Sequence, residues 1–176
     1  FLYHLKRLKN YNVVQLINEK PIKTFPFLER YLLARLFRQN TKTFLLSSGI
    51  DLISLEFMLE KKFRYSLMDP FHENPGLKTD YKYIQEFQSK SHRKTHEFVF
   101  ENITGVIATD FDYVLPLLNH KKFLGLIPNP INTERIHFKP LAIENTVVIF
   151  LGINRWTYHK KGMPFFEKAL KIIKDT

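Results

Sequence analysis

The stretch KTFLLSSGIDLISLEFMLEKK, residues 42–62, contains one complete strand–turn–helix unit. Its first part, residues 42–48, is a short apolar run that favours a strand, and Gly49 permits the turn that follows. Asp51 then stands where a helix N-cap accepts hydrogen bonds from backbone amides, so residues 51–62 are predicted to form a helix. One such unit cannot bury its apolar face alone, so the fold depends on whether the pattern recurs.

The same alternation of short strands and longer helices recurs on both sides of this stretch. The predicted strands are residues 12–18, 42–48, 63–69, 104–110, 122–129 and 146–152. The predicted helices are residues 25–40, 51–62, 80–102, 111–119 and 162–174. Strands and helices that alternate at these lengths predict an α/β fold, with a Rossmann-like, mostly parallel sheet and helices on both faces.

The composition indicates a folded protein with a negatively charged partner. Hydrophobic residues make up 44% and aromatic residues 15% of the 176 positions, enough for a sizeable core. The lack of cysteine excludes disulfides and thiolate metal sites and fits a reducing compartment. Because Lys and Arg number 27 against 17 Asp and Glu, a formal net charge of +10, we expect phosphate-bearing partners: nucleic acid, an anionic membrane surface or a phosphorylated small molecule.

The chain changes character in the stretch IPNPINTERIHFKP, residues 127–140. Two prolines stiffen it around Asn129, and the strand pattern resumes only at Thr146. The predicted organisation is an amino-terminal domain over 1–128, a linker over 129–145 and the beginning of a second domain over 146–176. Because one strand and one helix cannot bury a core, we expect the second domain to be truncated, and the first to be incomplete at its start.

The loop INRWTYHKKG, residues 153–162, places cations between a strand and a helix. Free amides at the start of the helix favour an anion, and Gly162 lets the backbone approach it closely. Arg155 offers a planar fork for phosphate oxygens, and Lys161 offers a point charge. With Gly152 at the end of the strand, these residues predict a diphosphate site; the alternative is a solvated basic loop.

Taken in order, the linker and the loop resemble the GT-B glycosyltransferases of the large retaining nucleotide-sugar family, the group 1 glycosyltransferases. The matching residues are Pro128-Asn129-Pro130-Ile131, Phe138-Lys139-Pro140, Gly152, Arg155, Lys161, Gly162 and Glu167-Lys168-Ala169-Leu170. The likeness covers roughly residues 102–176, and before that only the architecture is shared. Three departures stand out: two residues separate Gly152 from Arg155, Asn132 replaces the usual aspartate, and the family's E-x7-E segment would lie beyond Thr176.

The resemblance implies transfer of a hexosyl unit from a UDP- or GDP-linked sugar to a glycan or lipid-linked acceptor, with retention. It implies that Arg155 and Lys161 bind the donor diphosphate and stabilise the leaving nucleoside diphosphate, without a metal or other cofactor. It also implies polysaccharide biosynthesis in the cytoplasm, peripheral to the inner membrane face. Because the donor half is incomplete, we expect this chain to be inactive, and we assign no catalytic residue.

A different class of function stays open beside the transferase. A non-catalytic basic module that binds phosphate or nucleic acid would use the same positive surface. Nucleic acid is the weaker alternative, because the sequence contains neither the RNA-binding sheet signature nor a helix-turn-helix pattern.

Other residues carry two interpretations each. Asp69 and His72 could contact the donor sugar, as a histidine near this position does in the family, or could belong to a polar surface loop. His92 and His96 lie one helical turn apart and could bind zinc. A solvated basic helix face is favoured, because Arg93 stands where a zinc hydrolase motif needs glutamate.

The predicted helix 25–40 has an arginine side and a leucine side. Arg30, Arg35 and Arg38 share an arc with Phe27 and Tyr31, opposite the leucines. Arginines interleaved with aromatics suit an anionic membrane surface. The alternative is an ordinary outer helix of the sheet with a charged face.

Overall fold

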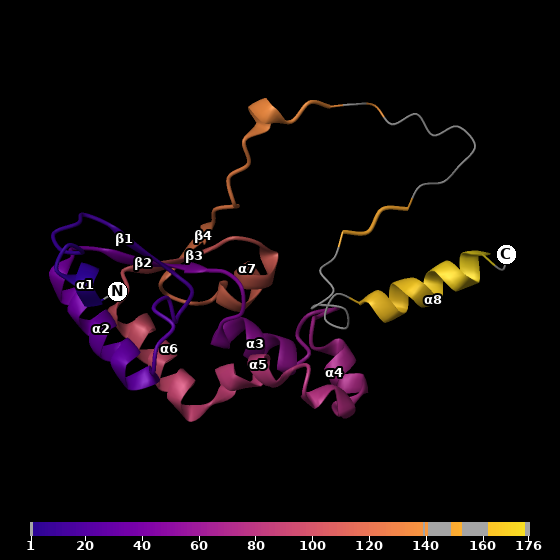
Figure 1. Cartoon of the computed structure of the whole chain (residues 1–176), viewed down its shortest axis with the longest axis horizontal. Coiled ribbons are helices and arrows are strands. Elements are labelled where there is room, and N and C mark those ends of the chain that lie inside the picture. The colour runs from indigo at the N-terminus through magenta and orange to yellow at the C-terminus, as the bar shows by residue number, and fades with distance from the viewer. Residues whose placement is uncertain (1, 139, 141–148, 153–161, 175–176) are drawn as a thin grey trace. The chain divides into compact units, whose positions relative to one another are not determined.

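The computed structural model describes residues 2–138, 140, 149–152 and 162–174 (Figure 1). Its helices are α1 (Leu2–Leu5), α2 (Pro26–Gln39), α3 (Leu52–Leu59), α4 (Asp69–Glu73), α5 (Lys82–Gln85), α6 (Lys90–Asn102), α7 (Phe111–Leu117) and α8 (Met163–Lys174). Its strands are β1 (Val14–Ile17), β2 (Thr43–Ser47), β3 (Gly105–Ala108) and β4 (Phe123–Leu126), and short 3₁₀ helices are η1 (Pro75–Lys78), η2 (Glu86–Gln88) and η3 (Thr133–Arg135).

The chain divides into two compact units. The first comprises Phe1–Arg64 and Lys78–Asn129, and contains the whole sheet. The second comprises Tyr65–Leu77 and Pro130–Thr176, and contains α4 and α8. The first unit therefore ends one residue after the predicted boundary at 128, and it omits a short segment that the sequence did not set apart.

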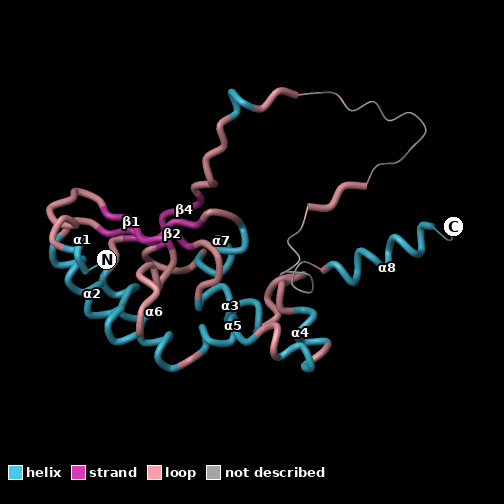
Figure 2. Tube along the Cα trace, viewed as in Figure 1, coloured by secondary structure: helices cyan, strands magenta, loops and turns pink. Residues whose placement is uncertain are grey.

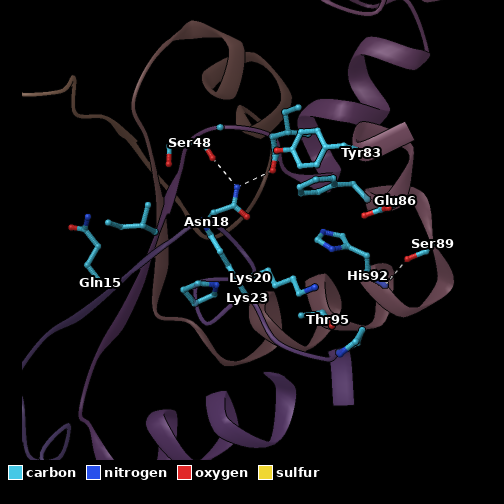
Figure 3. A pocket seen from close by; sticks show the side chains of 16 residues that line it. Gln15, Asn18, Lys20, Lys23, Ser48, Tyr83, Glu86, Ser89, His92 and Thr95 are labelled. Atoms are coloured by element: carbon cyan, nitrogen blue, oxygen red, sulfur yellow. Dashed lines mark hydrogen bonds between the residues drawn. The ribbon is translucent and has the colours of Figure 1, made fainter. Parts of the chain in front are cut away.

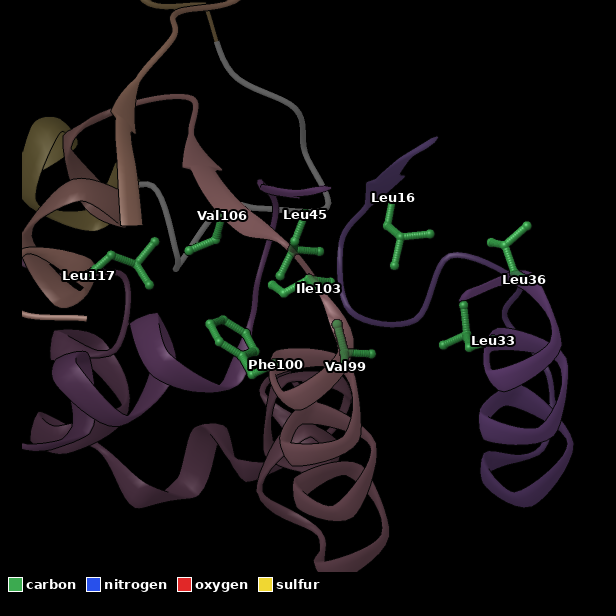
Figure 4. Close-up of a cluster of buried hydrophobic side chains, with 9 residues drawn as sticks. All are labelled: Leu16, Leu33, Leu36, Leu45, Val99, Phe100, Ile103, Val106 and Leu117. Atoms are coloured by element: carbon green, nitrogen blue, oxygen red, sulfur yellow. The ribbon is translucent and has the colours of Figure 1, made fainter. Parts of the chain in front are cut away.

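The sheet has four parallel strands in the order β1-β2-β3-β4, which confirms an α/β fold with a parallel sheet. The register pairs Leu16 with Leu45 and Leu45 with Val106, so these three buried side chains lie on one face. Helices α2, α6 and α7 cover that face (Figures 1 and 2). They contribute Leu33, Leu36, Val99, Phe100 and Leu117 to the core, and Ile103 follows α6 (Figure 4).

The opposite face of the sheet is apolar and largely open. Ile17 is 64% exposed and Leu124 is 59% exposed, and Leu46 and Ile107 are half-buried between them. Each strand is followed along the chain by its next neighbour in the sheet, so every connection crosses the sheet in the same direction. Right-handed crossovers that all run in one direction place every connecting helix on the same face of the sheet. Within the first unit, the connecting helices therefore lie on one face of the sheet and not on both faces as expected.

Most of the predicted elements are confirmed, but residues 63–69 form no strand. Turns and bends occupy this segment, and α4 begins at Asp69. The Asp69 carboxylate accepts hydrogen bonds from the Ser66 backbone amide at 2.7 Å and from the Ser66 hydroxyl at 3.0 Å. Such local side-chain bonds compete with strand pairing, which the apolar pattern alone does not reveal.

The long helix predicted over 80–102 is divided into α5, η2 and α6. Ser89 has extended backbone angles, and its hydroxyl accepts a hydrogen bond from the His92 amide at 3.2 Å. Ser89 is thus the N-cap of α6, and a new helix starts there. Of the predicted strand 146–152, residues 149–152 are described and form no strand, while the rest lies outside the described residues.

Candidate functional site

The predicted diphosphate loop is described only at its two glycines. Gly162 has a φ of 72°, in the left-handed region that glycine adopts readily, and its carbonyl accepts from the Phe165 and Phe166 amides, both at 3.1 Å. Helix α8 therefore begins where the sequence places it. Gly152 lies in a stretch without regular structure, and Arg155 and Lys161 lie outside the described residues. The diphosphate site stays a prediction.

Asp69 and His72 both belong to α4, in the second unit. The Asp69 carboxylate is already bonded to Ser66 and so has a role in the local turn. His72 differs: its Nε2 atom is buried and has no hydrogen-bond partner within the part of the chain that the structure describes. Contact of Asp69 or His72 with a donor sugar stays a prediction.

His92 and His96 point inward toward one carboxylate, so the expected solvated helix face is wrong for them. His92 Nε2 lies 2.9 Å from Glu19 Oε2, and His96 Nδ1 lies 2.6 Å from Glu19 Oε1. Glu19 is fully buried, and a buried carboxylate needs such partners to offset its lost hydration. Within the described residues, no group of three or more His, Cys, Asp or Glu side chains is arranged to hold a metal ion.

Asn18 explains how Glu19 reaches this position. It has a φ of 67°, directly after β1, and its side-chain amide donates to the Ser48 and Ile50 carbonyls, both at 2.8 Å. Its side-chain oxygen accepts from the Glu19 amide at 2.6 Å. The left-handed turn and these bonds join the end of β1 to the loop after β2, and they direct Glu19 toward α6.

Three neighbouring ionisable groups, the buried Glu19 and Asp51 and the half-buried His96, influence one another's pKa. Burial raises the pKa of Glu19, but hydrogen bonds from His92 and His96 and their charges outweigh burial, so its pKa is lowered. Burial lowers the pKa of His96. The hydrogen bond to Glu19 and the negative charge of Glu19 raise this pKa by more than burial lowers it, so the pKa of His96 is raised. Burial and the charge of Glu19 raise the pKa of Asp51. The hydrogen bonds to Ser47 and Ser54 lower it by less, so the pKa of Asp51 is raised. Glu19 therefore carries the negative charge of the cluster.

A cavity of about 1000 Å³ adjoins this cluster at the carboxyl ends of β1 and β2. Its lining side chains come from residues 15–26, 48–50 and 83–95 (Figure 3). His92 belongs to both the cluster and the lining, and Lys20 and Lys23 also line it. Ligands of parallel α/β sheets bind beyond these strand ends, so this cavity is a candidate site of the first unit.

Sequence reasoning missed this site, although one signal was present. The polar triplet Asn18-Glu19-Lys20 follows the predicted strand 12–18 at its carboxyl end, where functional side chains of α/β proteins gather. The partner of Glu19 could not be read from the sequence, because His92 lies 73 positions away.

Helix α2 has the predicted leucine side but only part of the predicted arginine side. Leu32, Leu33 and Leu36 are buried, and Phe27 and Tyr31 are exposed. Arg30 instead donates to the Thr95 hydroxyl at 3.1 Å, on α6. Arg30 is therefore bonded within the first unit, and contact of α2 with an anionic membrane surface stays a prediction.

Two findings remain, one on membrane-spanning helices and one on similarity to known proteins. No described helix combines the length and the apolar character that crossing a membrane requires. The chain matches no family model, no curated protein and no solved structure.

Proposed function

We propose that this chain belongs to a glycosyltransferase of the GT-B type that transfers a hexosyl unit from a nucleotide sugar to a glycan or lipid-linked acceptor, with retention. Arg155 and Lys161 bind the donor diphosphate. Their positive charges stabilise the leaving nucleoside diphosphate as the bond to the sugar breaks. The reaction needs no metal in this proposal, because these cations and the first amides of α8 meet the phosphate charge.

One observation carries the proposal: the chain contains three motifs that resemble those of the GT-B family, in the same order and with similar spacing. They are the linker around Asn129, the Phe138-Lys139-Pro140 segment and the loop from Gly152 to Gly162. The structure adds support of a general kind. A parallel α/β unit ends at Asn129, inside the first motif, and α8 begins directly after Gly162.

The test is calorimetric titration of the chain with UDP and GDP. We expect one of the two to bind, and R155A and K161A each to weaken it at least tenfold, because a charge-assisted hydrogen bond contributes about 1.5–3 kcal/mol. The control is K171Q, which removes an exposed charge from the later part of α8. In the complete enzyme, R155A and K161A should each lower the rate of sugar transfer about a hundredfold or more.

Two results would contradict the proposal. If R155A and K161A bound the nucleoside diphosphate as tightly as the unchanged chain, this result would contradict the proposed diphosphate site. Binding of unrelated DNA or RNA that weakens steeply as salt rises, without selectivity for a nucleoside diphosphate, would instead favour the basic binding module.

A further inference from the structure

Glu19 holds His92 in one orientation at the edge of the cavity. Because Glu19 is ionised it can only accept, so the His92 Nε2 atom, 2.9 Å away, carries the hydrogen. In the neutral ring the other nitrogen, Nδ1, is then a hydrogen-bond acceptor. Phe87 packs against the same ring, with centroids 4.6 Å apart. Glu19 thus occupies Nε2 of His92, and Nδ1 is the ring nitrogen that an uncharged His92 offers as an acceptor to a ligand hydroxyl.

Two lysines line the same cavity from a loop that is held in place. Glu29 is fully buried, and its two oxygens accept from the Ile22 and Thr24 amides, each at 2.8 Å. Between these two anchors Lys23 has a φ of 58°, which is uncommon for a lysine. The fold thus fixes the backbone that carries Lys20 and Lys23, and two ammonium groups on a fixed loop suit a phosphate.

The remaining wall is aromatic. The rings of Tyr83 and Phe87 lie edge to face with centroids 5.7 Å apart, and both line the cavity (Figure 3). Tyr83 is 56% exposed, so its apolar ring is available to a ligand. Small-molecule sites combine such apolar surface with a few placed polar groups.

We propose that this cavity binds a sugar phosphate, with the phosphate on Lys20 and Lys23, a ligand hydroxyl donating to His92 Nδ1 and the C–H face of the sugar against Tyr83 and Phe87. The orienting carboxylate is Glu19, which does not touch the ligand. All the lining residues of this site lie within 15–95, and none belongs to the predicted diphosphate loop, residues 153–162.

The first experiment titrates the whole chain with glucose 6-phosphate, inorganic phosphate and glucose. We expect glucose 6-phosphate to bind at least tenfold more tightly than either of the others, because only it meets the lysines and His92 together. Equal affinity for glucose 6-phosphate and inorganic phosphate would overturn the sugar part of the inference, and no binding of glucose 6-phosphate would overturn all of it.

The second experiment separates the cavity from the general positive charge. The double variant K20Q/K23Q should weaken glucose 6-phosphate at least tenfold. Its control, K6Q/K9Q, removes the same charge from exposed residues ahead of β1, away from the carboxyl edge, and should leave the affinity unchanged. An equal loss in both double variants would show non-specific attraction and contradict the site.

The third experiment tests His92 without removing the partner of Glu19. In H92Q the glutamine amide can still donate to Glu19, while the acceptor at Nδ1 is lost. We expect about a tenfold loss for glucose 6-phosphate and no change for inorganic phosphate. In the unchanged chain, the ¹⁵N signal of His92 Nδ1 should move when glucose 6-phosphate is added. An unmoved signal with an unaffected H92Q would contradict the role of His92.

The same variants distinguish this inference from the proposed function. If both sites exist, K20Q/K23Q keeps its affinity for UDP or GDP, and R155A keeps its affinity for glucose 6-phosphate. If nucleoside diphosphates fail to bind while the cavity variants behave as expected, the proposed function fails and this inference stands.

Discussion

Glu19 is the buried charge around which the carboxyl edge of β1 is organised. Its carboxylate bonds two histidines of α6, and the Leu52 amide of α3 also donates to it at 3.4 Å. A single side chain thus joins β1 to two helices. Removing one partner of a buried charged pair usually costs about 3–5 kcal/mol, so we expect E19Q to destabilise the first unit by about 3 kcal/mol.

The Glu19–His96 pair predicts a stability that depends on pH in two directions. The pKa of Glu19 is lowered, so its contribution is complete above its ordinary value of 4.5 and is lost as the pH falls below that value. The pKa of His96 is raised, so its contribution is complete below its ordinary value of 6.5 and is lost as the pH rises above that value. The pair therefore stabilises most between pH 4.5 and 6.5.

Urea unfolding of the unchanged chain and E19Q across this range measures the effect. The difference in the free energy of unfolding should be largest between pH 4.5 and 6.5 and should shrink on both sides. A difference that stays constant with pH would show that the pair does not titrate as proposed.

At the scale of elements, the start of α3 is the feature that the sequence predicted best. The Asp51 carboxylate accepts from the Ser54 amide at 2.8 Å, and the Ser54 hydroxyl in turn accepts from the Asp51 amide at 3.5 Å. This is a capping box, and the Ser47 hydroxyl also donates to Asp51. Position 51 is thus a helix cap, which needs an acceptor but not a charge.

The variants D51A and D51N test that distinction. D51A should lower the free energy of unfolding by about 2 kcal/mol, because it leaves the Ser54 amide and the Ser47 hydroxyl without their acceptor. D51N should cost less than about 0.5 kcal/mol, because asparagine is an equally good N-cap and carries no charge near Glu19. Urea unfolding at constant pH measures both, and an equally large loss in D51N would show that the charge itself stabilises.

Residues 63–69 and 80–102 were predicted least well, because a local polar bond overrides the apolar pattern in each. The apolar residues of 63–69 favour a strand, but the bonds between Ser66 and Asp69 form a turn instead. Ser89 likewise divides a segment that reads as one helix. Periodicity reports which side chains are apolar, and it does not report which polar side chain will bond its own backbone.

At the scale of the whole molecule, the first unit ends where the chain leaves the sheet. Residues 129–138 are exposed throughout and contain only the short η3. Exposed, irregular segments are the preferred sites of proteolysis. We expect brief trypsin treatment to cut after Arg135 before it degrades the sheet unit, with mass spectrometry identifying the amino-terminal product.

The variant R135Q is the matched control for this cleavage. It should delay the appearance of that product, and the product of the unchanged chain should keep a cooperative thermal transition, since β1–β4 and their core lie before residue 130. Simultaneous loss of all fragments would contradict a separately stable first unit.

The sequence by itself determined the class of fold and much of its local detail. Leucine spacing marked the buried side of α2, the cap residue marked the start of α3, and the alternation of elements predicted the parallel sheet. Only the tertiary structure placed Glu19 against His92 and formed the cavity that His92 lines, because 73 positions separate the two residues. Local patterns report on neighbours along the chain, whereas a buried charge is matched by whatever partner the packing of the sheet brings beside it.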